Sequence, residues 1–118
     1  MRLFLLFLLI TGQTFANEQS YNRGEMLFFS QACSSCHGPD AEGSTTYPKL
    51  ANKKKSYLLE RLHAFKNGKV LNNSQQMMAQ FIEQLSEQDI NDLATFLSEH
   101  KKVETKDVAD DLLGGFGS

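Results

Sequence analysis

The sequence predicts an all-α protein, because apolar residues recur at helical spacing in several segments that also carry helix-start signals. Clear apolar stripes run through residues 22–32, 57–66 and 87–100, and a shorter helical stretch covers 78–84. The segments between them are rich in Gly, Pro, Asn and Ser, which is the composition of loops. No strand-like alternation surrounds the two cysteines. We therefore expect three to four main helices joined by loops.

The N-terminus has the pattern of a secretory signal peptide, which we assign to residues 1–16. A positive start at Arg2 precedes an unbroken apolar run at 3–10, and Thr14-Phe15-Ala16 offers the small residues of a cleavage site. The alternative is an uncleaved anchor, but the apolar run is too short to span a bilayer. Cleavage after Ala16 would deliver a mature chain without a membrane span to the periplasm.

The remaining length supports one domain, which we place at residues 17–103. Residues 104–118 lose the helical pattern and end in Gly-Gly-Phe-Gly-Ser, so we expect a flexible C-terminal tail. The alternative is that Leu112, Leu113 and Phe116 dock on the domain or on a partner.

Charge is distributed unevenly along the chain. The formal net charge is −2, with +3 in residues 17–82 and −6 in residues 83–118. No strongly basic stripe exists, which argues against nucleic acid as a partner. Lysines cluster at Lys49 and at 53–55, where they either steer an acidic partner protein or form an ordinary solvated turn.

The first helix is predicted to begin near residue 22, with Ser20 or Asn22 as its cap. A glycine inside a helix costs about 1 kcal/mol relative to alanine. Gly24 is such a glycine, and it shares a face with Leu27 and Phe28. We therefore predict that another helix crosses closely at Gly24.

The other helices carry their own end signals. Ser56 is a candidate cap for the helix at 57–66, and Asn67-Gly68 is a typical helix end. Residues 69–76 are polar and are predicted to form a loop. Ser86 followed three positions later by Asp89 resembles a capping box for the last helix.

The strongest motif is Cys33-Ser34-Ser35-Cys36-His37, the attachment pattern of c-type haem. Residues three apart lie on one face of a helical turn, so both sulfurs can reach the two vinyl groups of one porphyrin. His37 follows directly and can ligate the iron as the proximal imidazole. The predicted cofactor is a single covalently attached haem c.

Three other interpretations of the two cysteines are weaker. A thioredoxin-like dithiol expects a βαβ context. A zinc site needs about four ligands, and only His63 and His100 remain as further Cys or His donors. A disulfide between Cys33 and Cys36 would leave His37 unexplained. We interpret His63 as a partly exposed surface histidine rather than a ligand.

Together these features resemble the small, single-haem class I c-type cytochromes of bacterial periplasms, and one half of the dihaem members. The resemblance covers about residues 21–100. It is carried by Gly24, Phe28, Cys33-Ser34-Ser35-Cys36-His37-Gly38, Tyr47-Pro48-Lys49-Leu50-Ala51, Tyr57-Leu58, Phe65-Lys66-Asn67-Gly68-Lys69, Met78, Leu85-Ser86-Glu87-Gln88-Asp89-Ile90 and Leu93-Ala94-Thr95-Phe96-Leu97. It implies a class I cytochrome c fold, in which the helices and loops wrap around the haem.

The resemblance also implies roles for particular residues. The sixth ligand should be a methionine seven positions before Leu85, which is Met78, with Met77 as the runner-up. Pro48 should offer its carbonyl to Nδ1–H of His37. Gly24 and Phe28 should pack against the last helix. Two positions depart from the pattern, because relatives often carry glycine at Asn52 and arginine at Val70. The second departure leaves Lys69 as a weak candidate to pair with a haem propionate.

The function that follows is that of a periplasmic electron carrier, not an enzyme, whose iron cycles between ferrous and ferric with His/Met ligation. We expect a monomer that forms transient complexes with redox partner proteins, whose identities the sequence does not name. The alternative is a cytochrome c subunit of a larger periplasmic oxidoreductase, for example with a flavoprotein. A third hypothesis is a haem enzyme or gas sensor with an open iron, against which Met78 argues.

Overall fold

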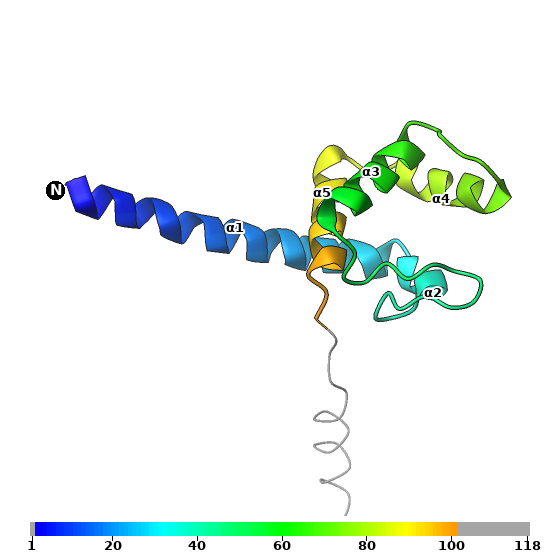
Figure 1. Ribbon diagram of the computed structural model, residues 1–118, viewed down its shortest axis with the longest axis horizontal. Coiled ribbons are helices and arrows are strands. Elements are labelled where there is room, and N and C mark those ends of the chain that lie inside the picture. The colour runs from blue at the N-terminus through cyan, green and yellow to red at the C-terminus, as the bar shows by residue number, and fades with distance from the viewer. Residues whose placement is uncertain (1, 102–118) are drawn as a thin grey trace, which may run out of the picture.

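The computed structural model describes residues 2–101, with side chains from residue 15 onward, and the predicted tail at 104–118 lies outside them. The order of elements is α1 (Arg2–Ser30), α2 (Cys33–His37), α3 (Lys55–Lys66), α4 (Asn73–Glu83) and α5 (Glu87–Ser98) (Figure 1). The described part of the chain contains no strand. The predicted all-α class is therefore confirmed.

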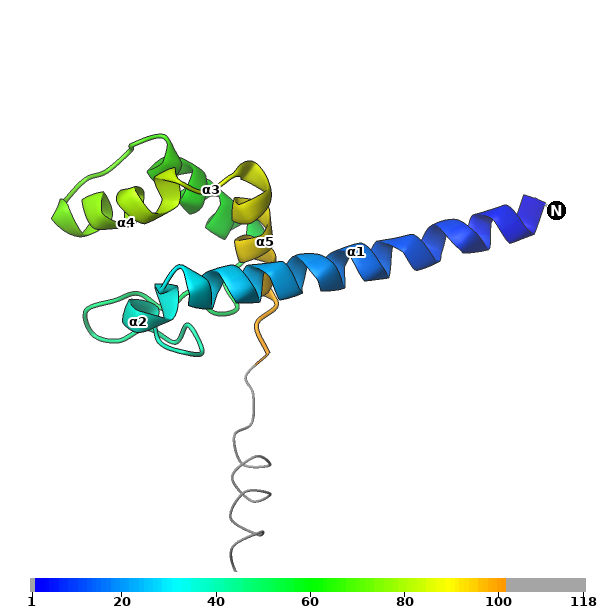
Figure 2. The same ribbon diagram turned by 180° about the vertical axis from the view of Figure 1, so that it is seen from behind.

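Helix α1 is longer than predicted. It begins at Arg2 rather than near residue 22, so Ser20 and Asn22 lie inside the helix and the prediction that either caps it is wrong. No proline interrupts residues 2–30, and leucine dominates the first part, so the helix continues through the apolar segment. Its first half projects from the rest of the molecule in both ribbon views (Figures 1 and 2). None of the described helices combines the length and hydropathy that crossing a membrane requires.

Helices α3 and α4 also differ from the prediction at their first turns. Ser56 does not cap α3, because the helix begins at Lys55 and Lys54 occupies the capping position without a side-chain hydrogen bond. Helix α4 begins at Asn73, where Asn72 Oδ1 accepts a hydrogen bond of 2.9 Å from the backbone N–H of Gln75. Half of the predicted loop at 69–76 is therefore helical, because Asn72 is a helix cap and not a loop residue.

The other helix-end signals act as predicted. Gly68, with φ of +74°, follows the last residue of α3 and its capping residue Asn67. Before α5, Asp89 N–H donates to Ser86 Oγ over 3.1 Å, and Ser86 N–H donates to Asp89 Oδ2 over 3.0 Å. This reciprocal pair is the predicted capping box.

Helices α1 and α5 cross closely at Gly24, as predicted. A Cβ placed on Gly24 would lie 2.0 Å from the carbonyl oxygen of Asp92 and 2.8 Å from Cβ of Phe96. On the same side of α1, the Phe28 and Phe96 rings pack with centroids 5.5 Å apart. The buried apolar core gathers around this crossing and comprises Phe28, Ala41, Ala51, Leu58, Leu62, Ile82, Leu85, Ile90, Leu93, Ala94, Phe96 and Leu97.

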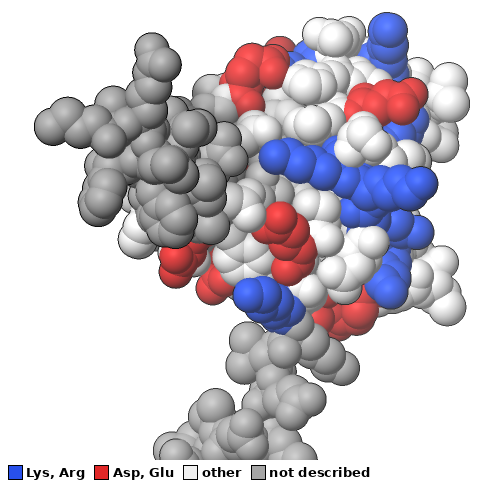
Figure 3. Space-filling view, turned by 60° about the vertical axis from the view of Figure 1, so that its left-hand side comes forward, with Lys and Arg blue, Asp and Glu red and all other residues white. Residues whose placement is uncertain are grey.

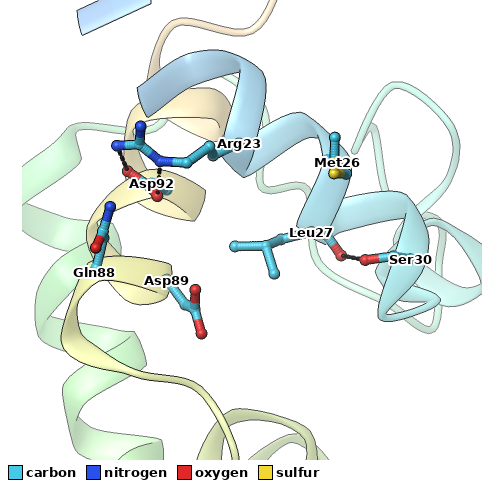
Figure 4. A pocket seen from close by; sticks show the side chains of 7 residues that line it. All are labelled: Arg23, Met26, Leu27, Ser30, Gln88, Asp89 and Asp92. Atoms are coloured by element: carbon cyan, nitrogen blue, oxygen red, sulfur yellow. Dashed lines mark hydrogen bonds and ion pairs between the residues drawn. The ribbon is translucent and has the colours of Figure 1, made fainter. Parts of the chain in front are cut away.

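A buried carboxylate also joins the two helices at the crossing. Asp92 is only 1% exposed, and one of its oxygens accepts a hydrogen bond from Ser20 Oγ at 2.6 Å. Its other oxygen accepts a hydrogen bond from Arg23 Nε at 2.8 Å (Figure 4). Burial alone would raise the pKa of Asp92, but these hydrogen bonds and the positive charge of Arg23 outweigh it and hold the pKa below its usual range. Asp92 is therefore ionised at neutral pH.

We predict that Gly24→Ala destabilises the protein strongly, because the added methyl group would overlap the α5 backbone. Overpacking of this kind costs roughly 1–3 kcal/mol or more in free energy of unfolding. The matched control is Gly68→Ala, where a Cβ would meet nothing within 4 Å and only the left-handed backbone is strained. That strain costs about 1 kcal/mol. Denaturant unfolding of the holoprotein measures both, and equal losses would contradict a close crossing at Gly24.

We also predict an acid-dependent contribution from Asp92. Because its folded pKa is lowered, its stabilising effect is complete above the unfolded pKa of about 3.9 and is lost as the pH falls through the folded value. Asp92→Asn should therefore cost roughly 1–3 kcal/mol at neutral pH, and this difference from wild type should shrink below about pH 4. Denaturant midpoints across this pH range measure it. Glu25→Gln on the exposed face of α1 is the charge control, and a pH-independent difference for Asp92→Asn would refute the prediction.

Candidate haem site

The single turn α2 holds both cysteines and the histidine. Ala32, in a left-handed conformation with φ of 60°, separates α2 from α1, and Gly38 with φ of 89° ends it. Cys33 and Cys36 are free and half-buried, and their spacing puts them on one face of the turn. Burial raises the pKa of the Cys33 thiol, and the neighbouring Cys36 raises it further.

His37 is buried, with 4% of its surface exposed, and is held in one orientation. Its Nδ1 lies 2.9 Å from the carbonyl oxygen of Pro48. A carbonyl oxygen can only accept, so Nδ1 is the donor in this hydrogen bond. The Tyr47 ring meets the imidazole edge-on with centroids 6.1 Å apart. The Pro48 carbonyl thus engages Nδ1, and Nε2 is the ring nitrogen left to bind a metal.

The loop at 38–48 brings Pro48 back to His37, and Gly43 makes this possible. Gly43 N–H donates to the His37 carbonyl over 2.8 Å. A Cβ on Gly43 would lie 2.6 Å from the Tyr47 carbonyl oxygen and 2.7 Å from the Pro48 carbonyl carbon, and its φ is +69°. Only glycine suits this position. The sequence signal for Gly43 was merely a glycine within a loop, which does not indicate that it packs against Pro48.

The two methionines of α4 have different surroundings. Met78 is half-buried and packs against the core, whereas Met77 is 51% exposed. Phe81, one turn further on, is 46% exposed. The main helix contacts are α1 with α2 and α5, and α3 with α4 and α5. Helices α2 and α4 are therefore held by different neighbours, and both ribbon views place them on the same side of the α1–α5 crossing (Figures 1 and 2).

The other two histidines have carboxylate partners. His63 Nε2 is 2.7 Å from Glu87 Oε2, and its side chain is partly exposed. His100 Nε2 is 3.3 Å from Asp40 Oδ1. Within residues 2–101, no three Cys, His, Asp or Glu side chains are grouped as metal ligands. The donor set that the fold brings together is therefore one imidazole and two thiols.

This donor set fits haem c. Two free thiols on one helical turn match the two vinyl groups of one porphyrin, and an oriented imidazole with an available Nε2 follows them. The partly covered Met78 and Phe81 add apolar surface of the kind that a flat porphyrin covers. Asn52, at the position where glycine is frequent in similar proteins, has a left-handed φ of 61° that asparagine tolerates.

Comparisons with known proteins agree with this geometry. The chain is 31% identical over 85 residues to cytochrome c4 of Azotobacter vinelandii, covering 70% of this chain and 40% of that protein. It is also 31% identical to cytochrome c-552 of Acidithiobacillus ferridurans, covering 66% of this chain and 33% of that protein. Cytochrome c-554(548) of Halomonas halodenitrificans is 31% identical over 67 residues, which cover 56% of this chain and 81% of that protein.

The chain thus spans about a third to two fifths of the length of the first two relatives. The family model for cytochrome c matches residues 21–101, which run from the second half of α1 to the end of the described chain. This match covers the α1–α5 crossing, the Cys33–His37 turn and Met78. The protein therefore belongs to the cytochrome c family, whose covalently bound haem c serves electron transfer.

Proposed function

We propose that this protein is a periplasmic electron carrier in which His37 and Met78 are the two axial ligands of one haem. The observation that carries the proposal is the combination of an oriented His37 imidazole with a half-buried methionine on the same side of the fold. The bound haem c supplies a one-electron iron couple. The chain supplies its attachment through Cys33 and Cys36, the orientation of its ligands and an apolar enclosure.

Met78 is the better candidate for the sixth ligand. A thioether ligand must reach inward, and Met78 packs against the core while Met77 is half exposed. Adjacent residues on a helix are about 100° apart, so both cannot face one iron. The hydrogen bond from His37 Nδ1 to Pro48 fixes the imidazole ring and makes it a stronger donor. Methionine opposite histidine favours the ferrous state and a raised reduction potential.

Two filled axial positions leave no site for a substrate, so the protein acts by passing electrons to and from other proteins. On the face shown in Figure 3, several Lys and Arg side chains lie close together, with Asp and Glu side chains around them. The lysines of the cluster in the sequence are all exposed, namely Lys49 and 53–55. We propose that they orient an acidic redox partner during transient encounters, which charge complementarity accelerates. We propose that the protein acts in the periplasm, after export and cleavage of the signal peptide after Ala16.

An optical redox titration of the holoprotein, combined with carbon monoxide binding, tests the function. We expect a single reversible one-electron transition, because one iron keeps both ligands in both states. The reduced protein should bind no carbon monoxide at neutral pH, because Met78 occupies the sixth position. Rapid carbon monoxide binding by the wild type would instead indicate an enzyme or sensor with an open iron.

Variants of the two methionines test the ligand assignment. Met78→Ala should abolish the methionine–iron charge-transfer band of the oxidised protein and lower the reduction potential. Met77→Ala should retain the band and cost on the order of 1 kcal/mol at most in stability, because its side chain is half exposed. The Met78→Ala test includes a version in which His63 and His100 are also changed, since either could replace the lost ligand. The assignment is wrong if Met77→Ala is the variant that loses the band.

A further inference from the structure

Helix α4, which carries Met78, has few attachments to the rest of the protein. Its main contact is with α3. Its buried side chains are Ala79 and Ile82, which lie on one face. Its last turn contains no basic residue of its own, although the exposed carbonyl groups at a helix C-terminus carry partial negative charge and lack intrahelical donors.

A lysine from the neighbouring helix α3 supplies the positive charge and the hydrogen-bond donor that the C-terminus of α4 lacks. Lys66 is the last residue of α3, and its Nζ donates a hydrogen bond to the carbonyl oxygen of Leu85, just beyond α4. The same Nζ lies 3.5 Å from the carbonyl oxygen of Glu83, the last residue of α4. Lys66 is half-buried, and Leu85 is part of the core. The ammonium group therefore lies among the carbonyl groups at the end of α4.

We propose that Lys66 is a positioning residue for Met78. A helix is stiff over a turn and a half, so fixing the end of α4 at Glu83 and Leu85 also fixes the rotation of the helix at Met78. Hydrogen bonds to a charged donor are stronger than neutral ones, and a cation at a helix C-terminus is favourable. Lys66 thereby limits how often α4 swings away and Met78 leaves the iron. This inference rests on the proposed His37 and Met78 ligation.

A positioning lysine and an ordinary surface lysine differ in their effect on the sixth ligand. An ordinary lysine would contribute to stability or solubility without affecting the sixth ligand. A positioning role predicts that its removal shifts the competition between Met78 and an external ligand for the ferric iron. Imidazole is a suitable probe, because it binds there only when the methionine has left.

The experiment is an imidazole titration of the oxidised holoprotein, followed by its absorption spectrum. Lys66→Met keeps the length of the side chain and removes its charge, and it should raise the apparent imidazole affinity roughly three- to tenfold. Lys66→Arg should restore an affinity close to that of wild type. Lys101→Met, which removes an exposed lysine whose backbone N–H bonds to Tyr21 of α1, should have no effect. Equal affinities for Lys66→Met and Lys101→Met would overturn the proposal.

The same titration in a Met78→Ala background separates this inference from the ligand assignment. With no methionine to displace, Lys66→Met should no longer change the imidazole affinity. If it raises the affinity equally in that background, Lys66 does not act through Met78 and the proposal fails. If Met78→Ala, with His63 and His100 also changed so that neither can replace the lost ligand, binds imidazole no better than wild type, then Met78 is not the ligand, and the proposed ligation fails together with the role of Lys66.

Discussion

The close contact between α1 and α5 at Gly24 organises the molecule. With no side chain at Gly24, the two helix backbones approach until the Asp92 carbonyl and Cβ of Phe96 lie against α1. Phe28 and Phe96 can then pack ring against ring. The attachments of α2, α3 and α4 all lead back to this pair, directly or through one neighbour. The position of every proposed haem-binding residue therefore depends on the crossing.

The crossing supports the two sides of the proposed haem site through different numbers of intervening helices. Helix α2 follows α1 directly, and the loop from Gly38 to Pro48 folds back on it, so His37 is fixed by nearby contacts. Helix α4, which carries Met78, contacts α3, and α3 in turn contacts α5. The hydrogen bond of His63 with Glu87 joins α3 to α5. The hydrogen bond of Lys66 to the Leu85 carbonyl joins α3 to the end of α4. The histidine side is thus fixed by contacts close in the sequence, whereas the methionine side depends on the packing of α4 on α3 and of α3 on α5, to which these polar contacts add.

The buried Asp92 shows how a charge can be accommodated at the centre of such a packing. A buried carboxylate is costly unless hydrogen bonds and an opposite charge accompany it. Ser20 and Arg23 provide both from one face of α1, one turn apart. They lie beside Gly24, so the polar and steric conditions for the crossing come from the same stretch of α1. This arrangement selects one register of α1 against α5, because sliding either helix would leave Asp92 without its partners.

The sequence by itself determined the features that depend on neighbours within a turn or two: the Cys33-to-His37 turn, the capping box at Ser86, the end of α3 at Gly68 and the apolar stripes of the helices. Local spacing and capping hydrogen bonds decide such features. The predicted starts of α1 and α4 were wrong, because the polar residues before the predicted starts can form either a loop or a helix. Only the tertiary structure decided the pairing of Arg23 with Asp92, which lie 69 positions apart, the packing of Gly43 against Pro48, and the different exposure of Met77 and Met78. These depend on which surfaces the α1–α5 crossing brings together, and no local pattern along the chain specifies that.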